Sequence, residues 1–267
     1  MIKKFLVIGN PIDHSLSPKL HNYWINKNNI NAVYDKKKIN DNDIKDIISE
    51  VKEEKICGIN VTVPFKKSVI SFLDELSPEA NETQSVNTIY MKEKKIIGHN
   101  TDIAGFELGI RHSKYDIKNK KIFILGAGGV VPSIIVGLKR MNPAKIILCN
   151  RTKQRALDLK KHFKELEIVD WMNVPSETDV IINATSIGLN KEDDLELDYK
   201  KIGGNKLFYD VIYNPPETNF LKKAKAMGNI TENGKMMFIY QAHQAFTIWN
   251  KIMPKIDDET IKMLDND

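Results

Sequence analysis

Cysteines, long apolar runs and regularly spaced metal ligands are scarce or absent in this chain of 267 residues. Its two cysteines, Cys57 and Cys149, are too few for a disulfide framework, so a reducing compartment, the cytoplasm, is expected. No apolar run approaches the roughly 20 residues of a membrane span, and the N-terminal stretch MIKKFLVIGN lacks the long apolar region of a signal peptide. The six histidines show no metal-ligand spacing. These absences argue against a disulfide-rich secreted scaffold, a membrane protein and a metal enzyme.

The charge balance is mildly basic, with a net charge of +5 carried by scattered lysines. Most of these lysines are expected to be solvated surface groups. Aromatic residues are not interleaved with them and no nucleic-acid motif is present, so we expect neither a DNA nor an RNA partner. A mild positive field favours an anionic small molecule as the substrate.

Two runs of alternating segments divide the chain. The first hundred residues alternate strand-like and helix-like segments, which predicts an α/β domain. From residue 121 onward, short apolar strands predict a doubly wound parallel sheet, the Rossmann fold. These strands are expected at 122–125, 146–149, 168–170, 180–183 and 207–212, with a short one near residue 230. An amphipathic helix is expected over 236–251, followed by a short helix after Pro254.

A glycine-rich turn follows the first strand of the second domain, with Gly126, Gly128 and Gly129 in sequence order. A strand, a tight turn and a helix N-terminus in this order can cradle a phosphate with backbone N–H groups. The match to the dinucleotide fingerprint is imperfect, because Val131 stands where the third glycine is usual. Pro132 is tolerated only in the first helical turn and therefore indicates where the helix starts.

The carboxylate that NAD-binding folds place after their second strand is missing here. Asn150, Arg151 and Thr152 stand at that point, with Arg155 close behind. A planar guanidinium suits the 2′-phosphate of NADP better than the 2′-hydroxyl of NAD. The alternative is that both arginines are merely solvated at a helix start.

A second polar cluster is expected in the first domain, where Lys66 follows a predicted strand and Asp102 opens a helix. Asn60 and Thr62 alternate with apolar residues along that strand, which places them on one polar face. A lysine and an aspartate beside one substrate hydroxyl make a proton-handling pair. The alternatives are a solvated lysine and an aspartate that only caps its helix.

The loop after the first strand carries Ser15 and Ser17. Serine hydroxyls and nearby backbone N–H groups can hold a carboxylate. Because Pro18 follows Ser17, the sequence also predicts that the Ser17 hydroxyl caps a helix, and both roles are compatible.

The joint order of these motifs resembles the shikimate dehydrogenase family from one end of the chain to the other. No single motif is decisive, but their order and spacing together are specific. The matching stretches are 9–11 (GNP), 15–18 (SLSP), 60–66 (NVTVPFK), 85–88 (SVNT), 98–106 (GHNTDIAGF), 126–129 (GAGG), 150–152 (NRT), 183–188 (NATSIG) and 209–215 (YDVIYNP), followed by Gly234 and Gln241.

The resemblance implies a reversible reduction of 3-dehydroshikimate to shikimate with NADPH, in the chorismate pathway to the aromatic amino acids. Lys66 would be the general acid in reduction and the general base in the reverse direction, with Asp102 orienting it. The implied substrate-binding residues are Ser15, Ser17, Asn60, Thr62, Lys66, Asn87, Asp102, Tyr213 and Gln241. The implied NADP-binding residues are Gly126, Ala127, Gly128, Gly129, Val130, Asn150, Arg151, Thr152, Arg155, Ile212 and Gly234.

The same resemblance implies a division of labour along the chain. Residues 1–102 would form the substrate-binding catalytic domain and residues 103–236 the NADP-binding Rossmann domain. Residues 237–267 would form C-terminal helices that pack on the substrate domain. The enzyme would be a monomer or a homodimer, without a metal, a nucleic acid or a membrane as partner.

Two other functions stay open at this point. A related quinate/shikimate dehydrogenase can use NAD and oxidise quinate, although the missing carboxylate after the second strand disfavours it. A non-catalytic nucleotide-binding sensor on the same fold is disfavoured because a sensor has no need of Lys66 and Asp102.

Overall fold

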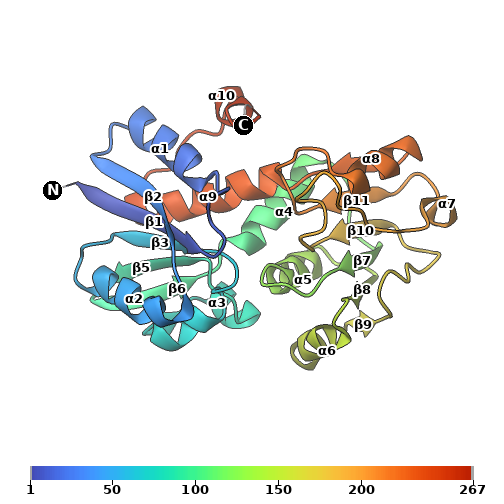
Figure 1. Cartoon of the computed structure of the whole chain (residues 1–267), viewed down its shortest axis with the longest axis horizontal. Coiled ribbons are helices and arrows are strands. Elements are labelled where there is room, and N and C mark those ends of the chain that lie inside the picture. The colour runs from blue at the N-terminus through green and yellow to red at the C-terminus, as the bar shows by residue number, and fades with distance from the viewer. Residues whose placement is uncertain (1, 266–267) are drawn as a thin grey trace. The chain divides into compact units, whose positions relative to one another are not determined.

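A computed structural model describes residues 2–265 of the chain and divides it into two compact units (Figure 1). The first unit contains the residues up to Gly105 together with those from Ile239 onward, and the second runs from Phe106 to Phe238. The chain leaves the first unit within α4 (Asp102–His112) and re-enters it within α9 (Lys235–Asn250). The boundaries expected from the sequence, after residues 102 and 236, fall in the first turns of these helices.

The first unit is built on a six-stranded mixed sheet with the order β2-β1-β3-β5-β6-β4. Strand β1 runs parallel to β2 and β3, whereas β5 runs antiparallel to β3 and β6. The strands are β1 (Lys3–Gly9), β2 (Ala32–Lys38), β3 (Gly58–Val61), β4 (Glu75–Leu76), β5 (Thr88–Lys92) and β6 (Lys95–His99). The helices are α1 (Ser17–Lys27), α2 (Ile44–Lys52), α3 (Pro78–Thr83) and α10 (Asp258–Lys262), with short 3-10 helices η1 (Asp41–Asp43) and η2 (Ser68–Phe72).

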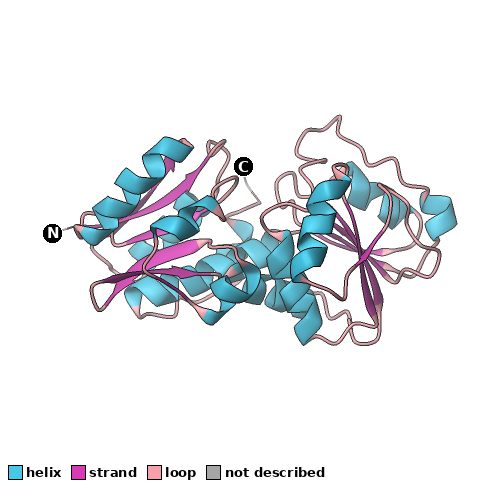
Figure 2. Cartoon of the chain, turned by 90° about the horizontal axis from the view of Figure 1, so that it is seen from below, coloured by secondary structure: helices cyan, strands magenta, loops and turns pink. Residues whose placement is uncertain are grey.

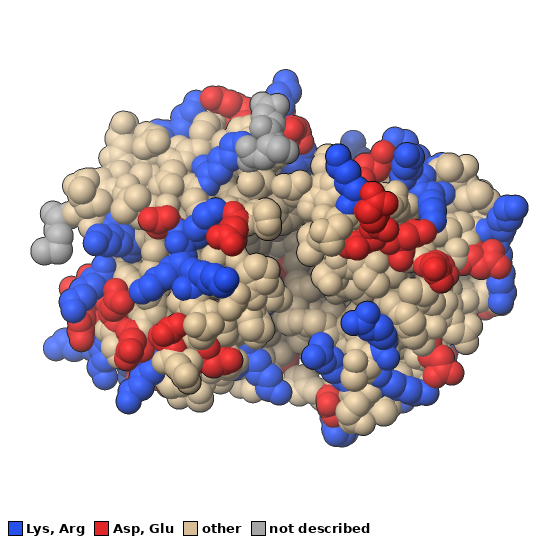
Figure 3. Space-filling model, in the orientation of Figure 1, with Lys and Arg blue, Asp and Glu red and all other residues tan. Residues whose placement is uncertain are grey.

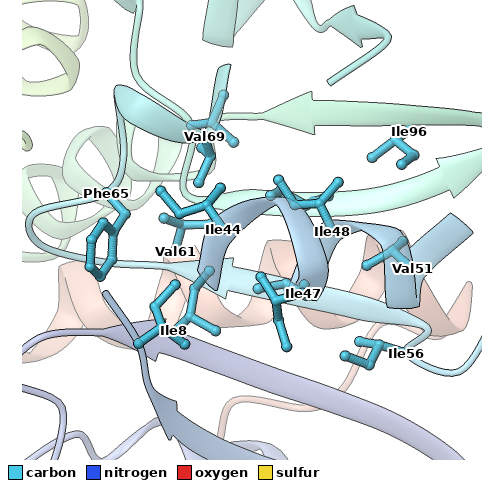
Figure 4. Packing of buried hydrophobic residues seen from close by; sticks show 14 of the residues in the cluster. Ile8, Ile44, Ile47, Ile48, Val51, Ile56, Val61, Phe65, Val69 and Ile96 are labelled. Atoms are coloured by element: carbon cyan, nitrogen blue, oxygen red, sulfur yellow. The ribbon is translucent and has the colours of Figure 1, made fainter. Parts of the chain in front are cut away.

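Helix α2 shows why this sheet has a stable apolar layer. Its apolar residues recur at intervals of three and four, so they share one face of the helix. That face packs on strand residues such as Ile8 and Val61 (Figure 4). The four helix residues are each exposed by 3% or less and are Ile44, Ile47, Ile48 and Val51. This packing stabilises the sheet and with it the strand ends from which the loops leave.

The hydroxyl cap predicted for Ser17 is wrong. Helix α1 already begins at Ser17, and Leu16 occupies the N-cap position. The hydroxyl oxygen of Ser15 accepts the backbone N–H of Ser17 at 3.3 Å instead. The chain enters the helix one residue earlier than expected because Pro18, whose fixed φ suits the whole first turn, also fits as its second residue.

The second unit confirms the predicted doubly wound fold. Its six strands are all parallel and lie in the order β12-β11-β10-β7-β8-β9, which is the dinucleotide-binding order read from the opposite edge. The strands are β7 (Lys121–Leu125), β8 (Lys145–Cys149), β9 (Glu167–Ile168), β10 (Val180–Asn183), β11 (Leu207–Asp210) and β12 (Ile230–Glu232). Besides parts of α4 and α9, its helices are α5 (Val131–Arg140), α6 (Lys153–His162), α7 (Tyr199–Ile202) and α8 (Asn219–Ala226).

Both faces of this parallel sheet are covered, as Figure 2 shows with helices on either side of the strands. Phe123 and Leu125 join one apolar cluster with Phe208, whereas Ile122 and Ile124 point to the opposite face. All of these side chains are fully buried. Full burial explains why the strands read as continuous apolar runs. Ligands of such folds bind at the carboxyl ends of the strands, where the strand order reverses beside β7.

Charged side chains of both signs occur over each unit on the face seen in Figure 3. Many of the lysines form exposed ion pairs, such as Lys27 with Glu259 at 2.8 Å and Lys139 with Glu165 at 2.6 Å. Among residues 2–265 no helix combines the length and the apolarity that crossing a membrane requires.

Candidate active site

A buried ion pair lies at the carboxyl-end edge of the first sheet. Lys66 follows β3 by a short turn, Asp102 begins α4, and their Nζ and Oδ2 atoms lie 2.5 Å apart. The two side chains are only 11% and 7% exposed. Lysine and aspartate are seldom this buried unless they are paired. The alternative that Lys66 is a solvated lysine is therefore wrong.

Asn87 holds the other oxygen of the Asp102 carboxylate. Its Nδ2 donates to Asp102 Oδ1 at 2.8 Å and to Thr101 Oγ1 at 2.9 Å, and its Oδ1 accepts the Thr101 backbone N–H at 2.8 Å. The same Nδ2 lies 3.5 Å from Gln241 Oε1 on α9. Each carboxylate oxygen of Asp102 thus has its own donor, which fixes the plane of the carboxylate and the direction from which Lys66 approaches it.

Asn60 supports this cluster from β3. Its Nδ2 donates to the Asn87 backbone carbonyl at 3.1 Å and to Thr88 Oγ1 at 3.2 Å, and its Oδ1 accepts the Tyr34 hydroxyl at 2.7 Å. Both amide hydrogens of Asn60 are therefore used within the protein. Lys66, Asp102, Asn87, Gln241 and Asn60, all predicted from the sequence, form one connected group.

Three members of the network were missed by sequence reasoning, namely Tyr34, Thr88 and Thr101. Thr88 and Thr101 are completely buried and Tyr34 is 1% exposed. Their only signal in the sequence was a hydroxyl at a strand or strand-end position, which is equally typical of ordinary packing. Their roles depend on partners 13 to 28 residues away.

A neutral histidine lies behind the network. The ring of His21 stacks on the ring of Tyr34 with centroids 4.2 Å apart and planes inclined by 6°. Burial lowers the pKa of His21 to about 3, because the charged imidazolium would lose its hydration. Its Nε2 has no hydrogen-bond partner within the described part of the chain. His21 therefore contributes an uncharged ring to the packing beneath the site.

Ser15 and Thr62 lie on loops that leave the same sheet edge, and Ser17 is the first residue of α1, directly after the first of these loops. Strands β1 and β3 are neighbours and parallel, so their carboxyl ends meet there. The loops touch, since the Asn10 N–H donates to the Val63 carbonyl at 3.0 Å. A Cβ on Gly9 would fall 2.5 Å from the Thr62 methyl group, which shows how closely the two loops approach. Ser15, Ser17 and Thr62 are thus held at the edge that carries Lys66.

Tyr213 belongs to the second unit, where its ring stacks on Phe238 with centroids 4.5 Å apart. The prediction that it also contacts the substrate stays a prediction.

The glycine turn of the second unit has the conformation that its sequence predicted. Gly126 has a φ of +109°, and a Cβ there would fall 2.7 Å from the Ala184 carbonyl oxygen. The place of a Cβ on Gly128 is open, with the nearest atom 4.0 Å away. Helix α5 begins immediately afterwards at Val131, which is fully buried. A tight turn, open space and a helix N-terminus fit a pyrophosphate.

Asn150 braces the glycine turn against the loop after β8. Its Oδ1 accepts the Ala127 N–H at 3.0 Å and its Nδ2 donates to the Thr152 carbonyl at 2.8 Å. Arg151 and Arg155 are exposed, and no ion pair is found for either within residues 2–265. Two unpaired guanidinium groups beside a phosphate-binding turn fit the 2′-phosphate of NADP.

Ile212 and Gly234 lie side by side beyond β11. The Gly234 N–H donates to the Ile212 carbonyl at 3.1 Å. A Cβ on Gly234 would fall 2.1 Å from the Val211 carbonyl oxygen, so only glycine allows this backbone approach.

Comparisons with known proteins identify the family of this chain. Residues 7–89 match the family model described as the shikimate dehydrogenase substrate binding domain. Residues 109–211 match the model described as shikimate / quinate 5-dehydrogenase. The chain is 61% identical to the shikimate dehydrogenase (NADP(+)) of Pelagibacter ubique (strain HTCC1062), over 99% of this chain and 100% of that protein.

Solved structures are similar over the whole chain. The shikimate dehydrogenase from Aquifex aeolicus is 37% identical with a TM-score of 0.90, covering 100% of this chain and 98% of that one. The shikimate 5-dehydrogenase from Thermus thermophilus, solved with NADP(H) and shikimate, is 29% identical with a TM-score of 0.89, covering 99% and 98%. The resemblance seen in the sequence is confirmed, and the chain belongs to the shikimate dehydrogenase family.

Proposed function

We propose that this chain catalyses the reversible reduction of 3-dehydroshikimate to shikimate with NADPH, a step of the chorismate pathway. The observation that carries the proposal is the buried Lys66–Asp102 pair, whose polar neighbours are all oriented by hydrogen bonds. The Pelagibacter relative is named an NADP-dependent shikimate dehydrogenase, and the Thermus structure contains NADP(H) and shikimate.

Lys66 is the general acid of the reduction. When bound, the nicotinamide supplies a hydride to the ring ketone, whose C=O electron pair moves onto the oxygen. Lys66 donates the proton from Nζ to that oxygen, and in the reverse direction it accepts the proton from the hydroxyl. Asp102 keeps Nζ in place through the 2.5 Å contact, and Asn87 keeps Asp102 in place. The protein's contribution is mainly the positioning of these groups.

The remaining substrate contacts are assigned to the other polar residues of the predicted pocket. Ser15 and Ser17 bind the carboxylate of the substrate, and the other pocket residues contact its hydroxyl groups or that carboxylate. These other residues are Asn60, Thr62, Asn87, Tyr213 and Gln241. Since both amide hydrogens of Asn60 are used within the protein, its free capacity is the second lone pair of Oδ1.

The second unit binds NADP. The backbone of residues 126–130 holds the pyrophosphate, supported by the open space at Gly128. Arg151 and Arg155 hold the 2′-phosphate, with Asn150 and Thr152 completing that loop. Ile212 and Gly234 contact the nicotinamide end.

In this proposal the substrate domain comprises residues 1–102 with 237–267, and the NADP domain residues 103–236. We place the enzyme in the cytoplasm, as a monomer or a homodimer. Both cysteines are free thiols, which suits a reducing compartment.

The test is an absorbance assay at the band of reduced nicotinamide, with four pairs of substrate and cofactor. We expect turnover with shikimate and NADP+ to exceed that with shikimate and NAD+, or with quinate and either cofactor. Quinate with NAD+ is the second candidate, because the family model for residues 109–211 covers quinate dehydrogenases as well. Absence of turnover with all four pairs, despite NADP+ binding, would contradict the proposal.

A further inference from the structure

Three buried polar side chains lie at the carboxyl ends of β10 and β11 and have no part in the chemistry described so far. Asn183 and Asp210 end these two strands and are completely buried, and Thr218, at the start of α8, is 2% exposed. A buried carboxylate costs free energy unless its surroundings compensate for the lost hydration. Its retention at the ligand-binding edge of the sheet calls for an explanation.

Asp210 is held only by neutral donors. Its Oδ2 accepts the Thr218 hydroxyl at 2.6 Å, and its Oδ1 accepts the Asn183 Nδ2 at 3.1 Å and the Ile212 N–H at 3.0 Å. No lysine or arginine within residues 2–265 forms an ion pair with it. Burial raises the pKa of Asp210 to about 6, although the three hydrogen bonds act in the opposite direction. At neutral pH a carboxylate therefore accepts three charge-assisted hydrogen bonds.

The hydrogen bonds of Asp210, together with those of its partners, link three segments: the loop after β10, the loop after β11 and the segment before α9. Asn183 also donates to the Ile187 carbonyl at 3.0 Å, so it fixes the loop after β10. The Ile212 N–H ties the loop after β11 to Asp210 directly. The Ile212 carbonyl in turn accepts the Gly234 N–H at 3.1 Å, so the segment before α9 depends on the same carboxylate.

We infer that Asp210 is a positioning residue for the nicotinamide half of the cofactor site, which it organises by anchoring the backbone of Ile212 and, through it, Gly234. The inference rests on the proposed function, in which these two residues contact the nicotinamide end. Asp210 itself does not touch the reacting atoms. It keeps the two backbone segments in one arrangement, so that the nicotinamide ring is held at one angle on the second unit.

The sheet order separates this half from the adenosine half. The glycine turn follows β7 and the arginine loop follows β8, whereas Asp210 ends β11 on the other side of β7. The adenosine end is braced by its own contact, the bond from the Ala127 N–H to Asn150. Loss of the Asp210 carboxylate therefore disturbs one half of the site and spares the other.

The experiment compares the rate of hydride transfer with the binding of half a cofactor. In the Asp210→Ala enzyme we expect kcat for shikimate oxidation to fall by about tenfold or more, the scale of losing well-placed hydrogen bonds near the reaction centre. The Ki of adenosine 2′,5′-bisphosphate, which lacks the nicotinamide, stays within about twofold of wild type. The isotope effect on kcat for 3-dehydroshikimate reduction with NADPH deuterated at the transferred position rises, because hydride transfer limits the rate more strongly.

Two variants serve as comparisons. Asp210→Asn keeps the acceptor for Ile212 and offers an amide to Thr218, so its kcat returns to within about threefold of wild type. Asp179→Ala is the matched control, because Asp179 Oδ2 accepts the Lys121 N–H at 2.8 Å at the amino-end edge of the same sheet. It leaves both kcat and the bisphosphate Ki unchanged.

An unchanged kcat in Asp210→Ala, or a bisphosphate Ki that weakens in parallel with it, overturns the inference. Asp210→Ser, which keeps a hydroxyl but reaches too few of the donors, replaces Asp210→Ala if that variant does not fold, with the same expected and contrary results. Failure of the proposed function is distinguishable, because the wild-type enzyme itself would then lack turnover or NADP+ binding.

Discussion

The two units prepare their polar groups in opposite ways. In the first unit, Lys66, Asp102 and Asn87 are buried and hydrogen-bonded to one another before any ligand arrives. In the second, Arg151 and Arg155 are exposed and have no ion pair in the described part of the chain. A group that must transfer a proton at one atom needs a fixed position. A group that only recognises a doubly charged phosphate gains most when the ligand itself supplies the partner.

The largest effect is expected for Lys66→Ala, which removes one of the buried, hydrogen-bonded groups of the first unit. We expect kcat to fall by on the order of a hundredfold or more, the usual scale for a general acid–base group. The Ki of adenosine 2′,5′-bisphosphate should not change, because its proposed site is in the other unit. Steady-state assays in both directions measure the effect. Lys67→Ala is the matched control, since Lys67 is exposed next to Lys66 and should leave kcat unchanged. A near-normal kcat in Lys66→Ala would remove Lys66 from the mechanism.

The buried titratable groups of the two units should give opposite pH dependences of stability. The pKa of His21 is lowered from 6.5 to about 3, so the unfolded chain binds the extra proton and stability is lost as pH falls through 6.5. The pKa of Asp210 is raised from 3.8 to about 6, so the folded chain binds the proton first and stability is lost as pH rises through 6. At about 1.4 kcal/mol per pKa unit, each contribution to the free energy of unfolding is on the order of 3–5 kcal/mol.

Removing each group therefore changes the pH profile in its own direction. Between pH 7.5 and 5, we expect His21→Phe to lose less unfolding free energy than wild type, and Asp210→Asn to lose more. Urea denaturation at several pH values measures this, with hydrogen exchange to resolve the two units if they unfold separately. Parallel profiles for wild type and both variants would show that neither group titrates as its burial requires.

Arg155→Ala tests the exposed arginines of the second unit. Loss of a guanidinium from a phosphate should raise the KM for NADPH by about tenfold or more, since charge-assisted bonds of this kind contribute roughly 1.5–3 kcal/mol. The KM for NADH, which lacks the 2′-phosphate, should stay near its wild-type value. Lys160→Ala provides a control at the exposed far end of α6. Equal weakening of NADPH and NADH would argue against a 2′-phosphate contact.

The smallest effects are expected for substitutions of two glycines in one turn, Gly126 and Gly128. Gly126→Ala should lower the unfolding free energy by about 1–3 kcal/mol, because its φ is positive and its Cβ would meet Ala184. Gly128→Ala has open space and should change stability by less than about 0.5 kcal/mol, while weakening NADP+ binding. Denaturation and cofactor titration of both variants decide this. Strong NADP+ binding by Gly128→Ala would mean that the open space is not used by the ligand.

Sequence reasoning identified the elements of the fold well because their signals are local. The apolar runs near residues 122, 146, 180 and 207 became β7, β8, β10 and β11, and the alternation with helices correctly predicted a parallel sheet. The error at Ser17 was local as well. A serine before a proline fits both the cap and the first turn, and only the path of the incoming chain decides between them.

The residues of the candidate site also divide into those that the sequence indicated and those that only the structure revealed. Residue types and motif order already indicated Lys66, Asp102, the glycine turn and the arginines after the second strand. The role of a buried hydroxyl or carboxylate depends on which hydrogen-bond donor or acceptor lies opposite it. The sequence alone therefore did not reveal the roles of Tyr34, Thr88, Thr101 and Asp210. Those partners come from other strands and helices.

By itself, the sequence determined the fold class, the order of the strands along the chain and the family, because periodicity, turn residues and motif spacing act over short distances. Only the tertiary structure decided which polar groups are buried together. It placed Asn87 on the second oxygen of Asp102, and Ile212 on Asp210. The physical reason is that a hydrogen bond in a buried site requires its donor and acceptor to meet within about 3 Å. Residues far apart in the sequence reach that distance only when the sheet and its helices pack.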